Sequence, residues 1–306
     1  MQKTSDLDRL IESCEFRFDK LTLKDIDNSF VLKLNRPKTK EEEITLFHRD
    51  VSCGDDYFEI LHNFIHKSLI SGNAAPVVRF ADGEYAFYSK DLHCNGLYQQ
   101  AESVKAIRKA IPLHLKALKI LNRSGKYAPL IYPGNIRHKK KTFFSFLHKS
   151  RIDDRALKFT EFLSHQSIEL TNENYIPFYV VYAYLTSKQF FEILEGKKVC
   201  IINSEFNLDL CRKWFASSSS CPDIFFVEIP DAYVATQWES IRKEILDRIP
   251  ADTDLCIVGA GIGSLLVCVD VANEFSIPAI DAGHVLNMMN GREDKSGEPR
   301  LYTIHK

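Results

Sequence analysis

The fold is decided around the stretch Pro76-Val77-Val78-Arg79-Phe80-Ala81-Asp82-Gly83-Glu84-Tyr85. The short apolar run in its first half is flanked by Gly72 and Pro76 and predicts a short buried strand. The strand ends at Asp82-Gly83-Glu84, where Gly83 favours a sharp turn because glycine adopts backbone angles that other residues avoid. Open α/β sheets bind ligands at the carboxyl ends of their strands, so an arginine and two acids here indicate a binding site.

Asp82 and Glu84 are the candidate metal ligands. Two acids separated by one residue suit Mg²⁺ or Mn²⁺, which binds hard oxygen ligands and commonly bridges substrate phosphates. The alternative is an ordinary surface turn, because Asp-Gly is common in loops. Spacing alone favours the surface turn, so the rest of the chain has to decide between the two interpretations.

Composition places the chain among ordinary soluble proteins. Its 306 residues suffice for one large domain or two modest ones, and 45% of them are hydrophobic. The net charge of −1 provides no basic field for bulk nucleic-acid binding. No apolar run approaches the ~20 residues of a membrane helix, and the N-terminus has no apolar signal core. We therefore expect a cytoplasmic protein with no transmembrane segment and no nucleic-acid partner.

The eight cysteines indicate a reducing compartment. None of them forms a Cys-x-x-Cys pair, which argues against a zinc knuckle or a thioredoxin-type site. Cys200, Cys256 and Cys268 lie in apolar runs, so we expect them to be small core residues.

The second half of the chain alternates short apolar runs with amphipathic segments. Strands are predicted at 199–202, 224–229, 255–258 and 277–280, with helices at 208–215, 237–249 and 265–275 between them. Such alternation is typical of a parallel sheet covered by helices. Helices at 55–70 and 103–121 and a strand at 127–132 extend the pattern toward the N-terminus. The predicted fold class is α/β, with a Rossmann-like, mostly parallel sheet.

Three further segments bear on organisation. Residues 1–50, with a possible strand at 29–34, are set apart as a variable segment, which leaves one domain at 51–306. The basic cluster Arg137–Lys141 is either a solvated loop or an electrostatic clamp for phosphate or an anionic acceptor. In the aromatic stretch 175–182, Pro177 argues against a central strand, and most rings are expected in the core, with one or two beside a planar ligand.

A glycine-rich loop, Gly259-Ala260-Gly261-Ile262-Gly263-Ser264, follows the predicted strand at 255–258. It invites a dinucleotide or S-adenosylmethionine interpretation, with Asp281 as the ribose-binding acid, but the strict dinucleotide motif requires glycine at 264. Such motifs also belong to the first strand–helix turn of a fold, and here only about 40 residues remain. The loop is alternatively a phosphate cradle of backbone N–H groups, or a device for close packing.

Asp281 and His284 lie just past the last predicted strand, at the same sheet edge as Asp82 and Glu84. A lone histidine is usually structural. The neighbouring Gly283 and the convergence of polar strand ends favour a functional role for His284.

Two of these motifs resemble those of bacterial GT-D fold glycosyltransferases. Arg79-Phe80-Ala81-Asp82-Gly83-Glu84 is similar to the family's Arg-Phe-Gly-Asp-Gly-Glu, and Ala279-Ile280-Asp281-Ala282-Gly283-His284 is similar to its Ile-Asp-Ile-Gly-His. The order of motifs matches over residues 55–290. The chain departs from the family at Ala81, where glycine is common, and at the Gly259 loop, where the family usually has Gly-Pro-Thr.

The resemblance implies transfer of a hexose from a nucleotide sugar, typically a UDP-sugar, to a glycan or glycoprotein acceptor in polysaccharide biosynthesis. Asp82 and Glu84 would be catalytic acids that hold Mn²⁺ or Mg²⁺. His284 would bind the diphosphate or orient these acids. The remaining implied donor-binding residues are Arg79, Gly83, Gly259, Gly261, Gly263 and Asp281.

The sequence leaves the general base open among Glu205, Asp231 and Asp281. It also leaves two other functions open. One is an S-adenosylmethionine- or NAD-dependent enzyme that uses the Gly259–Ser264 loop, and the other is a non-catalytic module with the same fold.

Overall fold

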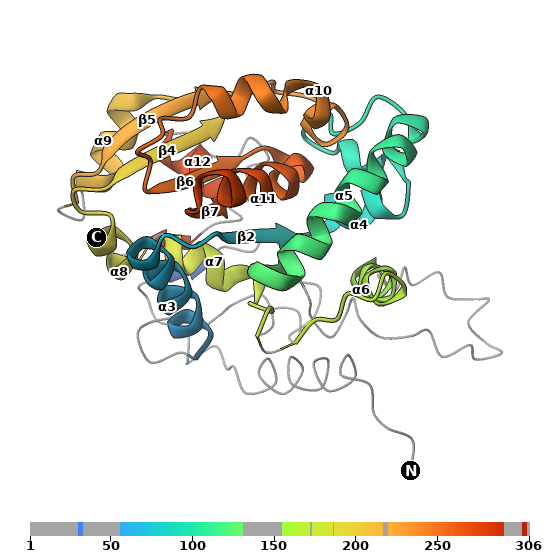
Figure 1. Cartoon of the computed structure of the whole chain (residues 1–306), viewed down its shortest axis with the longest axis horizontal. Coiled ribbons are helices and arrows are strands. Elements are labelled where there is room, and N and C mark those ends of the chain that lie inside the picture. The colour runs from blue at the N-terminus through green and yellow to red at the C-terminus, as the bar shows by residue number, and fades with distance from the viewer. Residues whose placement is uncertain are drawn as a thin grey trace, which may run out of the picture.

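A computed structural model describes residues 30–32, 56–130, 155–171, 173–185, 187–216, 220–290 and 302–304. The proposed boundary at residue 50 and the basic cluster Arg137–Lys141 lie outside these residues. Within them, the main feature is a parallel sheet of six strands with helices packed against it (Figure 1). The predicted fold class is therefore confirmed.

The six strands follow the order β3-β2-β7-β6-β4-β5, and every neighbouring pair is parallel. Their bounds are β2 Ala75–Phe80, β3 Lys126–Pro129, β4 Lys198–Asn203, β5 Asp223–Glu228, β6 Leu255–Gly259 and β7 Pro278–Asp281. All carboxyl ends consequently meet at one edge of the sheet. β2 lies between β3 and β7, so the strand of the opening stretch is central, as its unbroken apolar sequence requires.

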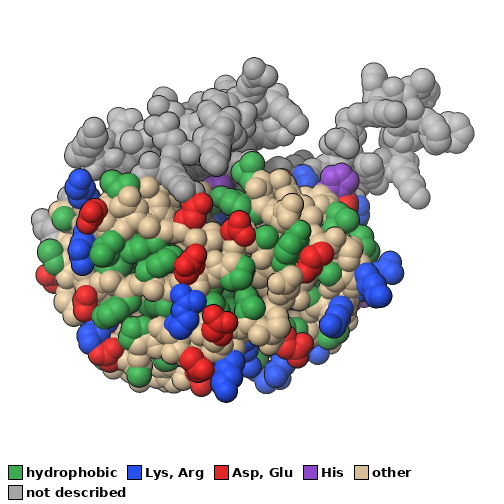
Figure 2. Space-filling model, turned by 90° about the horizontal axis from the view of Figure 1, so that it is seen from above, with side chains coloured by type: hydrophobic (Ala, Val, Ile, Leu, Met, Phe, Trp, Pro, Cys, Tyr) green, Lys and Arg blue, Asp and Glu red, His purple; other side chains and the backbone are tan. Residues whose placement is uncertain are grey.

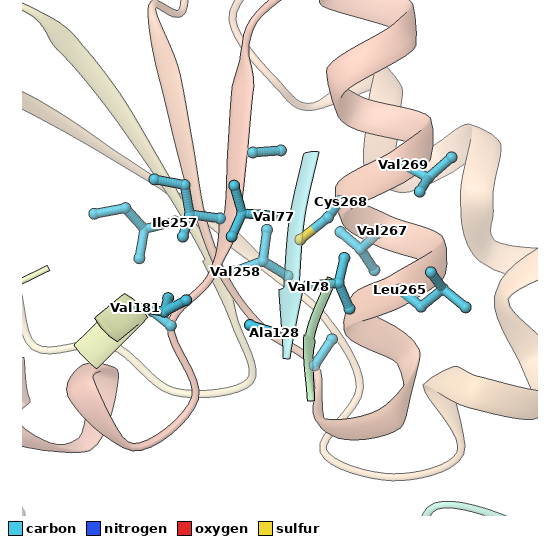
Figure 3. Packing of buried hydrophobic residues seen from close by; sticks show 14 of the residues in the cluster. Val77, Val78, Ala128, Val181, Ile257, Val258, Leu265, Val267, Cys268 and Val269 are labelled. Carbon is cyan, nitrogen blue, oxygen red and sulfur yellow. The ribbon is translucent and has the colours of Figure 1, made fainter. Parts of the chain in front are cut away.

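Helices cover the sheet on both faces. Helix α11 (Ser264–Phe275) contacts β2, β6 and β7, and α5 (Val104–Ser124) and α10 (Val234–Asp247) pack against it. Helices α3 (Asp56–Ser71) and α7 (Phe178–Leu185) also contact β2. Figure 3 shows α11 and Val181 of α7 on opposite sides of β2. The remaining helices are α4 Asp82–Tyr88, α6 Arg155–His165, α8 Lys188–Ile193, α9 Leu208–Ala216 and α12 His284–Met289.

The core lies between these layers. The β2 residues Val77 and Val78 have side chains on alternate faces of the strand and are both almost completely buried. The thiols of Cys200, Cys256 and Cys268 are buried too, which confirms the expectation that they act as core residues. Large-to-small changes in such a core cost about 2–5 kcal/mol, because the surroundings collapse only partly.

Most predicted elements are confirmed, with one instructive exception at Asp82-Gly83-Glu84. These residues form the first turn of helix α4 rather than a sharp turn, and Gly83 does not have a positive φ. The chain changes direction at Ala81, which is extended and precedes the helix. The prediction that glycine freedom makes the turn was therefore wrong.

The aromatic stretch forms helix α7, in agreement with the argument against a central strand. Three rings of the stretch, on Tyr175, Phe178 and Tyr182, are buried. At the termini, β1 (Phe30–Leu32) pairs antiparallel with β8 (Tyr302–Ile304), so part of the predicted strand at 29–34 is present. Among the described residues, no helix combines the length and apolar character needed to cross a membrane.

Candidate functional site

A buried ion pair joins β2 to β7 at the carboxyl edge. The Arg79 Nη2 donates to Asp281 Oδ1 at 2.8 Å, its Nε donates to the Asp281 carbonyl at 2.9 Å, and its backbone N–H lies 3.2 Å from Oδ2. Side-chain exposure is only 9% for Arg79 and 5% for Asp281. Because the two strands are hydrogen-bonded neighbours, this pair locks their carboxyl ends together.

Two aromatic rings of α7 enclose the guanidinium of Arg79. Its Nη1 donates to the Tyr182 hydroxyl, and its Cζ lies 4.5 Å from the Tyr182 ring centroid and 5.2 Å from that of Phe178. Burial opposes the charged form, but Asp281 and Tyr182 outweigh it and raise the pKa of Arg79 above its ordinary value. The rings expected beside a planar ligand thus flank an internal planar cation, and Arg79 is committed to protein partners.

Gly283 is required by the same pair. Its φ is +44°, in the left-handed region, and a Cβ at this position would lie 2.8 Å from the Arg79 guanidinium carbon. Glycine therefore lets the chain after β7 pass directly over the buried arginine. Its role at this position is close approach between chain segments.

Glu84 turns back onto its own helix. Its Oε2 accepts the Ala81 backbone N–H at 2.8 Å, which is the acidic half of a capping box. Burial raises the pKa of Glu84 to about 7, against the Ala81 hydrogen bond, which lowers it. The negative charge of Asp281 adds to the rise. This carboxyl group is thus partly buried and lies beside the Arg79–Asp281 pair.

Asp82 faces solvent and has a different partner. Its Oδ2 lies 3.3 Å from the Arg155 Nη2 at the start of α6, and the two side chains are 60% and 45% exposed. Helices α4 and α6 pack together, which places this arginine at the edge. The residues between β3 and α6 separate Arg155 from Asp82 in sequence, so no local motif identified it.

The Gly259–Ser264 loop has little open hydrogen-bonding capacity. The Ala260 N–H donates to Ser264 Oγ at 3.1 Å, the Ile262 N–H to Gln100 Oε1 at 2.9 Å, and the Gly263 N–H to the Ala260 carbonyl at 3.0 Å. A phosphate cradle needs such amides to be available for the ligand. The loop therefore lacks the open amides that the cradle interpretation requires at these three positions.

The glycines of this loop allow close packing instead. An added Cβ would lie 2.6 Å from Leu286 Cδ1 at Gly259, 2.6 Å from Gln100 Nε2 at Gly261 and 2.8 Å from Val234 Cβ at Gly263. Only Gly261, with φ +54°, also needs the left-handed region. This geometry corresponds to the packing alternative for the loop.

The remaining predicted residues are spread along the edge. His284 is the first residue of α12, and its Nδ1 lies 3.5 Å from Asn287 Nδ2. Glu205 follows β4 and Asp231 follows β5, three and four strand positions from β2. With about 4.8 Å between strands, these separations are roughly 14 and 19 Å. Asp231 therefore lies far across the sheet from Asp82, whereas Asp281 is adjacent but already paired.

Asp82 and Glu84 can hold a metal ion only if a bound ligand supplies part of its coordination. Among the residues that the structure describes, no group of three or more histidine, cysteine or acidic side chains is arranged to hold an ion. Asp82 accepts from Arg155 and Glu84 accepts from the Ala81 N–H, and the two oxygens of a carboxylate offer about four acceptor positions in total. Mg²⁺ is usually bound by one or two carboxylates together with substrate phosphates. The two acids thus suit an ion that arrives with a phosphorylated ligand.

A six-stranded parallel sheet with helices packed against it places the protein in the Rossmann-like α/β class, whose members generally bind ligands at the carboxyl ends of the strands. Within this class, residues 146–289 match the family model described as GT-D-like, a GT-D fold-like domain. Residues 146–289 are therefore similar to a GT-D-like domain, in agreement with the resemblance of the motif at 279–284, whereas the motif at 79–84 lies outside the match. No curated protein and no solved structure matches the chain.

The matched region contains only part of the candidate site. It contains β4 to β7 with Asp281 and His284, whereas β2, Asp82 and Glu84 precede it. The sheet nevertheless inserts β2 between β3 and β7. The two predicted end motifs are consequently neighbours in space, and the Arg79–Asp281 pair joins them directly.

Proposed function

We propose that this protein is a metal-dependent glycosyltransferase that moves a hexose from a nucleotide sugar to a glycan or glycoprotein acceptor. A UDP-sugar is the proposed donor, and Mn²⁺ or Mg²⁺ the proposed metal. The reaction is placed in the cytoplasm, in polysaccharide biosynthesis. The GT-D-like domain supports the class of reaction.

One observation carries the proposal. The exposed Asp82 and the partly buried Glu84 start helix α4 beside the buried pair that fixes β2 against β7, the last strand of the GT-D-like domain. A site on a rigid strand end holds its groups in place before the ligand arrives, which strengthens their interaction with developing charge. Acids so placed suit a substrate with a diphosphate group.

We assign the roles of the chain's own residues as follows. Asp82 and Glu84 would hold the metal, with the Glu84 carboxylate oriented by the Ala81 N–H. Arg155, whose guanidinium is close to half exposed, exchanges Asp82 for a diphosphate oxygen when the donor binds. Arg79 and Asp281 position β2 and β7 and do not touch the donor. When bound, Mn²⁺ or Mg²⁺ would supply positive charge to neutralise the nucleoside diphosphate leaving group.

The alternative of an adenine cofactor has less support. That function depends on the Gly259–Ser264 loop, whose Ala260, Ile262 and Gly263 amides already donate to protein acceptors. A third possibility, a non-catalytic module with this fold, predicts that changes at Asp82 and Glu84 have no effect on any ligand.

Calorimetry and thermal-shift measurements against UDP, GDP, NAD and S-adenosylmethionine, each with and without Mn²⁺, test the proposal. We expect UDP or GDP to stabilise the protein only with metal, and Asp82→Asn to abolish the effect. The matched control is Asp252→Asn, because Asp252 is an exposed acid paired with Lys198 at the opposite end of β4. Binding of an adenine cofactor without metal, or unchanged UDP binding in Asp82→Asn, would contradict the proposal.

A further inference from the structure

Strand β5 leaves one edge of the parallel sheet open. It pairs with β4 on one side, and no other strand among the described residues pairs with its outer side. An apolar edge strand with open backbone groups readily pairs with another strand, and proteins usually protect it with Lys, Pro or a covering element. The sequence of β5, Asp-Ile-Phe-Phe-Val-Glu, contains neither Lys nor Pro.

The hydrogen-bond pattern shows which groups face outward. The Asp223 and Ile229 N–H groups donate toward β4, to the Lys197 carbonyl at 2.8 Å and the Asn203 carbonyl at 3.1 Å. Since alternate residues of a strand direct their N–H and C=O groups to opposite sides, Ile224, Phe226 and Glu228 direct theirs away from the sheet. One of these groups is already used, because Arg248 Nη1 donates to the Glu228 carbonyl at 3.0 Å.

The middle of β5 is apolar, whereas its two ends carry the exposed acids Asp223 and Glu228. Ile224, Phe225 and Phe226 are all only half buried, whereas the corresponding residues of β4 are completely buried. Next to the strand, a shallow cleft of about 220 Å³ is lined by apolar and charged residues in similar numbers: Ile229, Pro230, Ile241 and Ile245, with Glu228, Glu244 and Arg248. Figure 2 shows hydrophobic side chains interspersed with acidic and basic ones on the face seen from above, where Figure 1 places α10 and β5.

We propose that β5 pairs antiparallel with β5 of a second copy of this chain, about a two-fold axis at Phe225. With this register, Ile224 faces the partner subunit's Phe226, and Phe226 faces the partner subunit's Ile224. Each facing pair exchanges both of its hydrogen bonds. All four outward groups of Ile224 and Phe226 are thus satisfied in each subunit, and the sheets join into one.

The ends of β5 select this register. An axis at Phe226 would require the Glu228 carbonyl, which Arg248 occupies. With the axis at Phe225, Glu228 faces the partner subunit's Pro222, which has no N–H to leave unpaired. Arg248 then lies beside the partner subunit's Asp223, an exposed acid, so the charges at the two ends are complementary. This complementarity favours a second copy over an unrelated strand.

Analytical ultracentrifugation of the full chain at micromolar concentration tests the pairing. We expect a species of twice the chain mass. Ile224→Pro removes an outward N–H without removing a bond to β4, and edge strands tolerate proline at such positions. The symmetric interface loses this bond twice, so we expect the dimer dissociation constant to rise by at least about tenfold. Ile224→Val, which keeps the N–H, is the matched control and should leave it unchanged.

Cross-linking tests the register independently. In a Cys221→Ser background, Phe225→Cys places two thiols directly across the axis, and we expect a disulfide-linked dimer under mild oxidation. In Phe226→Cys the two thiols are offset along the strand direction and do not face each other, so this variant should cross-link far less. Interfaces of standard size associate at protein concentrations of about 1 μM. A chain that is still monomeric at a concentration about 50–100-fold higher would overturn the proposal. Preferential cross-linking of Phe226→Cys would overturn the register and with it the assigned pairing.

Discussion

Two arginine–aspartate pairs lie at the same edge of the sheet and differ in almost every physical respect. Arg79 and Asp281 lie 2.8 Å apart, are 9% and 5% exposed, and are surrounded by aromatic rings. Arg155 and Asp82 lie 3.3 Å apart and are 45% and 60% exposed. The comparison shows that residue type and position at a strand end do not determine the surroundings of a charged group. The two pairs differ in burial, and burial sets how strongly each charge depends on its partner.

The physical reason is the cost of changing partners. A buried charge that loses its partner is left in a low-dielectric environment without hydration, so the pair cannot open to accept a ligand. Water screens an exposed pair and hydrates both groups, so one partner exchanges for a phosphate oxygen at little cost.

Breaking the buried pair is expected to have the largest effect. Arg79→Met leaves Asp281 buried without its cation, which should lower the free energy of unfolding by about 3–5 kcal/mol. Urea unfolding monitored by circular dichroism measures the loss. The double variant Arg79→Met/Asp281→Leu removes both charges and should recover part of it. A loss below about 1 kcal/mol in Arg79→Met would show that the pair does not fix β2 against β7.

Gly283 and Gly83 differ in how closely other atoms approach them, so replacing each with alanine tests where glycine is required for packing. Gly283→Ala places a Cβ against the Arg79 guanidinium at a positive φ, and should cost about 2 kcal/mol or more. At Gly83, the nearest atoms to an added Cβ lie 3.8 Å away and φ is not positive. Gly83→Ala should therefore change stability by less than about 1 kcal/mol, in the stabilising direction, because alanine favours helix. Thermal unfolding of both variants makes the comparison, and equal losses would contradict it.

His114 shows what burial does to a group that has no opposite charge. It is completely buried and bonded to the Tyr88 hydroxyl at 3.0 Å and the Ala235 carbonyl at 2.8 Å. Burial lowers its pKa to about 4, against the Ala235 bond, which raises it. Arg79, which is also buried, stays charged because a guanidinium is a far stronger base than an imidazole and because Asp281 lies beside it.

The sign of the pH dependence follows from this pKa. The unfolded chain takes up a proton at His114 near pH 6.5, whereas the folded protein takes it up only near pH 4. The contribution of neutral His114 is therefore complete above pH 6.5 and is lost as pH falls toward 4, by up to about 1.4 kcal/mol per pH unit. Unfolding at pH 7.5, 6 and 5 tests this, and His114→Gln should have a shallower slope. An unchanged slope would contradict the assignment.

The exposed pair should matter least for stability. Arg155→Ala is expected to change the free energy of unfolding by less than about 1 kcal/mol. In calorimetry with Mn²⁺, the same variant should bind UDP at least about tenfold more weakly, because it loses a charge-assisted bond. Lys198→Ala breaks another exposed pair, with Asp252, and should affect neither quantity. A large loss of stability in Arg155→Ala would show that the exposed pair stabilises the fold as the buried pair does, and would contradict this prediction.

The fold was largely predictable because its signals are local. Unbroken apolar runs in β2, β4 and β6 indicate strands buried on both faces, and the amphipathic periods of α3, α5 and α10 mark the helices between them. The first turn of α4 was missed, because Asp-Gly is common in turns whereas the Ala81–Glu84 capping bond becomes visible only in three dimensions. The interpretation of Gly83 failed for the same reason.

The candidate site was predictable in part. The sequence placed Asp82, Glu84 and Asp281 at one edge, because parallel strands end at the same edge. It did not show that Arg79 is enclosed by Tyr182, or that Arg155 returns to Asp82. These contacts join residues 73 to 202 positions apart, and no periodic pattern encodes such pairs.

The sequence by itself therefore determined the strands, the helices and the set of polar residues at the strand ends, because these depend on near neighbours along the chain. The tertiary structure alone decided which arginine is structural and which is exposed, since strand order and helix packing set burial and dielectric environment. It also decided that β5 is an edge strand and that Arg248 occupies one of its carbonyls. The same residue types thus have different roles because folding gives them different surroundings.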